Sequence, residues 1–151
     1  GATYAVTVAN PGSGNRYYID GQLQQKLYLR EGLTYKFDQS AGSNSGHPLR
    51  FSTTENGTHA GGSEYTTGVT TAGTPGSAGA YTQIVVAAGA PTLYYYCTNH
   101  SLMGGTANTL TGIVANSNYY VQGDGTLSTT TSTVLAGKAL STTSINLDYT
   151  T

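Results

Sequence analysis

The chain has 151 residues, a formal net charge of -1 at pH 7, and only 9% charged residues, a length typical of one domain or of one domain with an appendage. Its six Lys and Arg residues are scattered, so the basic patch that nucleic acid or an anionic membrane surface would require is missing. The sequence also contains no run of about 18 apolar residues, the pattern that predicts a membrane-spanning helix.

Short segments with alternating apolar residues, separated by Gly, Asn and Ser, predict β-strands along the first hundred residues. The predicted strands cover residues 4–8, 16–19, 27–30, 33–37, 48–52, 83–87 and 93–97. Residues 55–80 are rich in glycine and predict a long loop with room for one further strand. No segment of ten or more residues has a helical apolar stripe. This pattern predicts an all-β chain built as a sandwich or barrel.

The strand predicted at residues 93–97 is rich in tyrosine. Side chains alternate between the two faces of a strand. If Cys97 faces inward, then Leu93 and Tyr95 also face the core, while Tyr94 and Tyr96 face outward. Two outward tyrosines would form a contact surface.

The composition changes after residue 106. The following segment is full of Thr and Ser, and its short predicted strands lie at residues 113–114, 119–121, 134–135 and 145–147. We therefore expect one domain at residues 1–106 and a C-terminal β arm at residues 107–151. The arm has too few large apolar residues to form its own core. We expect it to pack against a neighbour, either a second copy of the chain or another structural protein.

The most informative stretch begins at the end of the strand at residues 93–97. Cys97, His100 and Met103 follow one another with the spacing C-x2-H-x2-M. Two imidazoles and a thiolate, with a weak axial thioether, are the donor set that selects copper in electron-transfer sites. The second imidazole can come from His47, which lies just before the strand at residues 48–52. The two loops can then meet at one end of a sandwich.

Other interpretations of these residues exist. Cys97 alone would be an ordinary core residue, and Met103, the only methionine, would fill a gap in the core. His59 competes with His47 for the ligand role, although its glycine-rich surroundings predict an exposed side chain. Cys97 with all three histidines would suit tetrahedral zinc, but zinc has no use for a thioether. The combined pattern favours one copper ion bound by His47, Cys97, His100 and Met103.

The run from Tyr94 to Gly105 resembles the ligand loop of cupredoxins, and its short spacing resembles that of the amicyanin-type members. Residues 27–52, which include Gly46-His47-Pro48-Leu49-Arg50-Phe51, are similar to the part of the family that leads to the first histidine ligand. Over residues 1–106 the resemblance implies a Greek-key β-sandwich with one type 1 copper ion. It also implies that His47 and His100 are the imidazole ligands, Cys97 the thiolate and Met103 the axial ligand.

Two residues beside the ligands depart from the family pattern. In cupredoxins the residue after the first histidine supplies a backbone N–H toward the cysteine sulfur, but here it is Pro48, which has no N–H. Asn99 stands where the family often has a proline before the second histidine. Because hydrogen bonds to the ligands tune such a site, Pro48 predicts a lower reduction potential.

The phrases at residues 47–54 and 94–101 also resemble cupredoxin-like modules of marine phage virions and bacterial surface proteins. This resemblance implies a location outside the cell, on a virion or on a cell surface, with the periplasm as the alternative. It favours a structural or interaction module of a larger, homo-oligomeric assembly.

The other function that we consider is a soluble one-electron carrier with a redox partner protein. Such carriers use charged patches for steering, and the scarcity of charge therefore favours the module. We expect no enzymatic activity, because a filled copper site leaves no open position for a substrate.

Overall fold

The computed structural model describes residues 1–110, 118–121, 127–128, 135–139 and 145–147. The chain divides into two compact units, Gly1–Leu110 and Thr111–Thr151. Two short 3-10 helices, η1 (Gly42–Asn44) and η2 (Gly57–Ala60), are the only helices of the described residues. Neither is long and apolar enough to cross a membrane.

The first sheet of the first unit has the strand order β3-β2-β1-β5-β9-β8. Its strands are β1 (Ala2–Ala9), β2 (Arg16–Ile19), β3 (Gln22–Leu23), β5 (Thr34–Asp38), β8 (Val69–Ala72) and β9 (Tyr81–Val85). The pair β1 and β5 is parallel and the other pairs are antiparallel. The sheet is therefore mixed.

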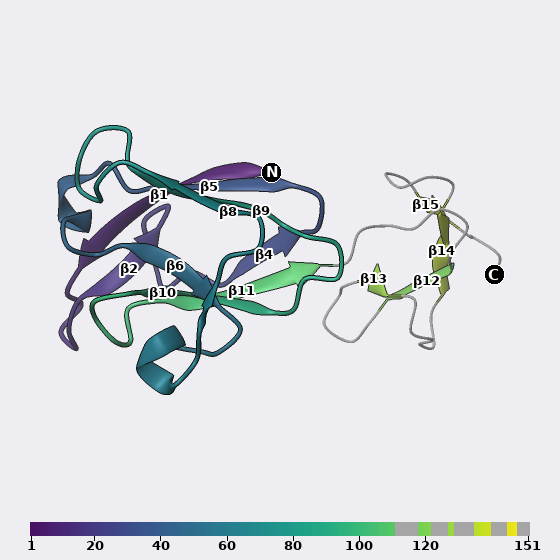
Figure 1. Ribbon diagram of the computed structural model, residues 1–151. Coiled ribbons are helices and arrows are strands. Elements are labelled where there is room, and N and C mark those ends of the chain that lie inside the picture. The colour runs from purple at the N-terminus through teal and green to yellow at the C-terminus, as the bar shows by residue number, and fades with distance from the viewer. Residues whose placement is uncertain (111–117, 122–126, 129–134, 140–144, 148–151) are drawn as a thin grey trace. The chain divides into compact units, whose positions relative to one another are not determined.

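The second sheet has the strand order β4-β11-β10-β6-β7. Its strands are β4 (Leu27–Arg30), β6 (Leu49–Ser52), β7 (Glu64–Tyr65), β10 (Leu93–Cys97) and β11 (Gly105–Leu110). Here the parallel pair is β11 and β4. In Figure 1 this sheet lies below the strands β1, β5, β8 and β9, as the second layer of a sandwich-like unit.

The core lies between these sheets because alternate residues of both point inward. Strand β4 alternates strictly, with Leu27 and Leu29 buried and their neighbours exposed. The rings of Phe37 from one sheet and Phe51 from the other meet edge to face, with their centroids 5.3 Å apart. A single cluster of buried residues extends from these rings to Cys97 at the end of β10. The period-two pattern of the sequence thus predicted a β-rich chain correctly.

Strand β11 and the segment after η2 differ from the sequence-based expectation. Residues 105–110 are small and polar, without apolar alternation, yet they form β11 because they pair with both β10 and β4. The first unit consequently extends to Leu110, beyond the expected boundary at residue 106. Residues 55–80 contain η2, β7 and β8 rather than one strand in a long loop.

The expectation that Tyr96 contributes to an outward contact surface is wrong, since the residue is only 1% exposed. Helix η2 covers it: a Cβ atom added to Gly57 would lie 2.6 Å from the Tyr96 ring. The His59 ring also packs edge to face on it, with centroids 6.3 Å apart. A covering segment from another part of the chain can bury the outer face of a strand, and alternation alone does not predict this.

The second unit contains a four-stranded sheet in the order β13-β12-β14-β15. Its strands are β12 (Asn118–Val121), β13 (Leu127–Ser128), β14 (Leu135–Ala139) and β15 (Ile145–Leu147). Three of the predicted strands, at residues 119–121, 134–135 and 145–147, fall on or next to strands of this sheet. The strand expected at residues 113–114 lies outside the described residues.

Candidate metal centre

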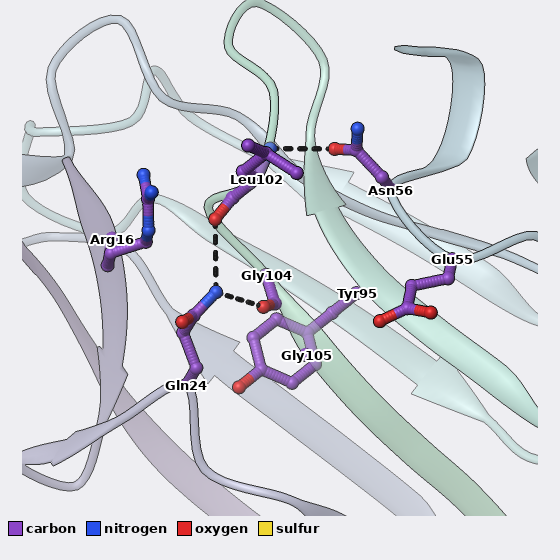
Figure 2. A pocket seen from close by; sticks show the side chains of 8 residues that line it. All are labelled: Arg16, Gln24, Glu55, Asn56, Tyr95, Leu102, Gly104 and Gly105. Atoms are coloured by element: carbon purple, nitrogen blue, oxygen red, sulfur yellow. Dashed lines mark hydrogen bonds between the residues drawn. The ribbon is translucent and has the colours of Figure 1, made fainter. Parts of the chain in front are cut away.

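The loop between β10 and β11, residues 98–104, carries two of the expected ligands and is tied to distant segments. Gln24 donates two hydrogen bonds from its Nε2, one to the carbonyl of Leu102 (3.0 Å) and one to that of Gly104 (2.6 Å). The amide of Leu102 donates to Oδ1 of Asn56 at 2.7 Å. Figure 2 shows both side chains reaching the loop, Asn56 from the right and Gln24 from below.

The loop before β6 carries His47 and is fixed by buried polar side chains. The carbonyl of His47 accepts hydrogen bonds from the Tyr17 hydroxyl (2.7 Å) and from Nε2 of Gln39 (2.8 Å). The Oε1 atom of Gln39 accepts a bond from the Leu49 amide at 3.0 Å. Asn44 carries the network onward to the carbonyl of Val6 in β1. These bonds define the backbone direction at His47 before any ion binds.

Both loops are also bonded directly to each other. The side chain of Asn99 donates to the carbonyl of Gly46 at 2.9 Å, and the Thr98 amide donates to the carbonyl of Pro48 at 3.2 Å. Pro48 thus contributes its carbonyl to the contact and has no N–H to contribute. Asn99 and Pro48, the two residues expected beside the ligands, lie at the junction of the loops.

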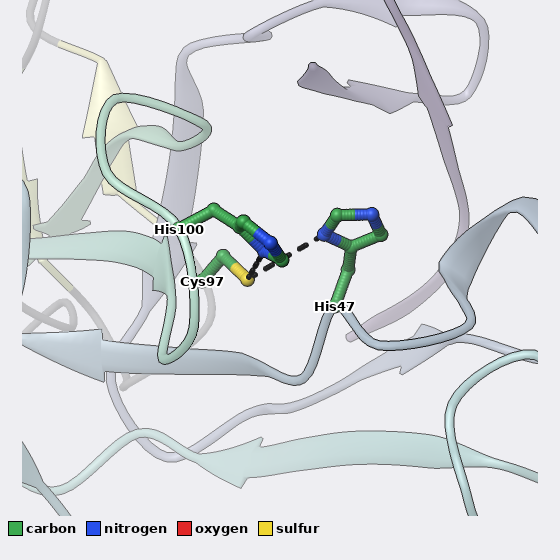
Figure 3. Close-up of side chains that lie close together, drawn as sticks. All are labelled: His47, Cys97 and His100. Atoms are coloured by element: carbon green, nitrogen blue, oxygen red, sulfur yellow. Dashed lines mark hydrogen bonds between the residues drawn. The ribbon is translucent and has the colours of Figure 1, made fainter.

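His47, Cys97 and His100 converge where the two loops meet (Figure 3). The sulfur of Cys97 lies 3.8 Å from Nδ1 of His47 and 3.7 Å from Nδ1 of His100. The imidazole rings lie side by side, with centroids 4.6 Å apart and planes inclined by 48°. One donor atom from each residue lies within 4.8 Å of the other two. In the part of the chain that the structure describes, no other group of three His, Cys, Asp or Glu residues meets this criterion.

These separations fit one shared metal ion. Nitrogen and sulfur donors lie about 2.0 and 2.3 Å from a first-row metal, and at a trigonal angle of about 120° they are about 3.7 Å apart. A tetrahedral angle would bring them to about 3.5 Å. The observed sulfur–nitrogen distances of 3.8 and 3.7 Å lie within about 0.3 Å of both values, so one ion can be shared by the thiol and the two imidazoles. The donor set therefore suits a His2Cys centre.

The site has a buried side and an exposed side. Cys97 and His47 are buried, whereas His100 is exposed. Burial, and then the proximity of His100, lower the pKa of His47, which favours the neutral imidazole that binds metals. Burial, together with the nearby Cys97, raises the pKa of Tyr17 well above its usual value. Its hydroxyl consequently stays protonated and donates to the His47 carbonyl.

Met103 and His59 occupy different positions relative to the cluster. Met103 is 1% exposed and belongs to the same core cluster as Cys97. Its carbonyl accepts a hydrogen bond from the amide of Tyr17 at 2.9 Å. His59 is exposed, as expected from the sequence, but its Nε2 lies 2.8 Å from the carbonyl of Cys97. His59 thus contacts the backbone of Cys97 and does not belong to the group of His47, Cys97 and His100.

No local pattern in the sequence indicates the residues that hold the two loops. Tyr17 reads as an ordinary strand residue, and Gln39 and Gln24 as polar loop residues. Tyr17 and Gln24 act through hydrogen bonds to segments 30 or more residues away in the sequence. A hydrogen-bonding partner at such a distance follows from the fold and not from local spacing.

Comparisons with known proteins add no family assignment. No protein-family model matches this sequence, and a search of curated proteins found no match. The interpretation of the site therefore depends on its donor atoms, their separations and their burial.

Proposed function

We propose that this chain binds one copper ion of the type 1 class, with His47, Cys97 and His100 as ligands and Met103 as the axial ligand. The observation that carries the proposal is the convergence of two imidazole nitrogens and one thiol sulfur within 4.8 Å of one another. The soft thiolate suits Cu(I), and the imidazoles suit both oxidation states. Copper bound there would supply one-electron redox chemistry.

Copper fits the site better than zinc does. Structural zinc is usually bound by four tetrahedral N, S or O donors. The cluster has three such donors, and the ring of His59 contacts the Cys97 carbonyl instead. Met103 is buried in the same hydrophobic core cluster as Cys97. Its thioether is a soft donor and a typical weak axial ligand of copper.

The fold that we propose for residues 1–106 is the Greek-key cupredoxin sandwich. Its support is the pair of facing mixed sheets and the position of the proposed ligands, which lie on the loop before β6, at the end of β10 and on the loop after β10. These strands are antiparallel neighbours, with Cys97 opposite Leu49. The pairing brings the start of β6 beside the end of β10, so both ligand loops leave the same end of the sheet.

The ligand residues divide the tasks of such a centre between them. Cys97 and His47 are buried, so water has little access to this side of the site. The hydrogen bonds to the His47 carbonyl restrict the movement of that residue. A site held in one geometry needs little rearrangement when its charge changes. His100 is the ligand that reaches the surface. Electron exchange with a redox partner through His100 is the role that this geometry favours for the ion.

A role as a structural or interaction module of a larger surface assembly is the second candidate. The low content of charged residues favours it, because carriers depend on charged patches for fast encounters. The separate β-rich unit at Thr111–Thr151 provides a segment for association on a virion or cell surface. In this role copper stiffens the junction of the two loops.

Copper titration of the purified protein tests the proposal. We expect the wild type to bind one equivalent of Cu(II) with intense visible absorption from thiolate-to-copper charge transfer. Cys97→Ser should lose this absorption, and His59→Ala, which changes a histidine outside the cluster, should keep it. Absence of the absorption in the wild type, or its persistence in Cys97→Ser, would contradict the proposal.

Size measurements and redox kinetics separate the two roles. A monomer whose copper exchanges electrons quickly with a small redox protein supports the carrier. A filament, a ring or another assembly of several copies, whose copper exchanges electrons slowly, supports the module.

A further inference from the structure

Three non-glycine residues with a positive φ meet at the β10–β11 loop, and one of them, Leu102, belongs to it. Gln24, Asn56 and Leu102 have φ angles of 44°, 63° and 63°, and Asp20 is the only other described non-glycine residue with a positive φ. This left-handed region is uncommon for residues other than Gly, Asn and Asp. Such conformations persist where the surroundings enforce them, and they gather at functional sites.

Packing does not explain the conformation of Leu102. Its side chain is 59% exposed, so little apolar burial depends on the backbone angle. Hydrogen bonds hold the residue from both sides: its amide donates to Asn56, and its carbonyl accepts from Gln24. The partners come from segments 46 and 78 residues away in the sequence.

The same bonds bracket Met103, the next residue. The carbonyls of Leu102 and Gly104 both accept from the Nε2 of Gln24, and the carbonyl of Met103 accepts from the amide of Tyr17. Gly104 lies directly on β10, since an added Cβ atom would overlap the Tyr95 carbonyl oxygen. Hydrogen bonds thus hold three consecutive carbonyls around Met103, and Figure 2 shows the two that Gln24 donates to.

We propose that Gln24 and Asn56 are positioning residues for Met103. Together they hold Leu102 in the left-handed conformation, and this conformation sets the direction of the Met103 side chain. The functional part of this inference rests on the proposed copper site, where Met103 is the axial ligand. We call the hydrogen bonds that join Gln24 and Asn56 to the β10–β11 loop the clamp. Because the clamp is made of protein groups alone, it also acts in the metal-free protein and can be tested there.

Isosteric substitutions separate the clamp from general stability. Gln24→Glu keeps the shape but replaces the donor amide with a carboxylate that repels two carbonyl oxygens. Gln25→Glu is the matched control, because the adjacent Gln25 side chain donates to the carbonyl of Lys26 and not to the β10–β11 loop.

Asn56 offers a second matched pair. Asn56→Gly removes the acceptor while tolerating the positive φ, and Asn56→Asp keeps an acceptor oxygen in place. The two pairs test the opposite sides of the clamp, so the inference stays testable if one variant fails to fold.

Met103 is the only methionine, so methyl-labelled methionine gives a single NMR signal. In the metal-free protein, we expect Gln24→Glu and Asn56→Gly to shift or broaden this signal. Loss of the hydrogen bond should speed hydrogen exchange of the Leu102 amide in Asn56→Gly by about tenfold. Gln25→Glu and Asn56→Asp should resemble the wild type. Addition of Cu(I) should move the wild-type signal strongly, and the signals of the two clamp variants less.

Unchanged methyl signals and unchanged Leu102 exchange in both clamp variants would overturn the inference, and so would an equal change in Gln25→Glu. If the wild type does not bind Cu(I), the proposed function fails, while the metal-free measurements still decide whether the clamp exists. If Cu(I) binds and leaves the wild-type methyl signal unchanged, the axial role of Met103 is wrong.

Discussion

Tyr17 and Gln39 both donate hydrogen bonds to the His47 carbonyl. We therefore expect substitutions of these two residues to be energetically coupled. Tyr17→Phe removes the hydroxyl that donates to it at 2.7 Å and keeps the ring in the core. Gln39 still donates to the same carbonyl, so no buried acceptor is left without a partner. We therefore expect the free energy of unfolding to fall by about 1 kcal/mol, the net value of an ordinary hydrogen bond.

Gln39→Leu should cost more, although the residue is equally buried. Its Oε1 is the acceptor for the Leu49 amide, and its Nε2 donates to Asn44 and His47. The substitution leaves a buried N–H without its acceptor, which alone costs about 1–3 kcal/mol. With the other lost bonds we expect a decrease of about 3 kcal/mol.

The double variant Tyr17→Phe/Gln39→Leu leaves the His47 carbonyl with neither donor. Its loss should therefore exceed the sum of the single losses by about 1 kcal/mol or more. Urea unfolding of the metal-free protein, followed by the near-ultraviolet circular dichroism of its tyrosines, measures all three values. Additive losses, or a Tyr17→Phe loss as large as that of Gln39→Leu, would refute this reasoning.

Three further predictions concern the surroundings of the site. Gly57→Ala should lower the free energy of unfolding by about 2 kcal/mol, because the new methyl group would overlap the Tyr96 ring and because residue 57 has a positive φ. Urea unfolding that matches the wild type would contradict this packing. His59→Ala should cost about 1 kcal/mol in the same assay and keep the Cu(II) stoichiometry, since its ring contacts the Cys97 carbonyl and the edge of Tyr96 but not the other donor atoms. Loss of copper binding would make His59 a ligand. Phe51→Ala should cost about 3–5 kcal/mol, because it leaves a cavity between the sheets; a thermal unfolding midpoint equal to that of the wild type would contradict the core.

The sequence predicted most of the strands that position the site, because alternation of apolar residues is a local signal. It failed for β11, whose small polar residues pair with the preceding strand β10 and with β4, which lies far away in the sequence. It failed for Tyr96 because η2 covers the outer face of β10. In both cases a contact between distant segments overrides the local pattern.

The candidate site shows the same division. The spacing of Cys97 and His100, and the place of His47 before a strand, were sufficient to nominate the three residues that the structure brings together. The residues that orient them, such as Tyr17 and Gln39, act through buried bonds to backbone carbonyls. Any polar side chain can make such bonds, so residue type and spacing do not reveal them.

X-ray absorption at the copper edge tests the central claim most directly, because it reports the atoms bound to the ion. For the protein loaded with one equivalent of copper, we predict a first shell of one short sulfur bond from Cys97 and two nitrogen bonds from His47 and His100. The short sulfur should disappear in Cys97→Ser. A wild-type shell made only of nitrogen and oxygen would contradict the account.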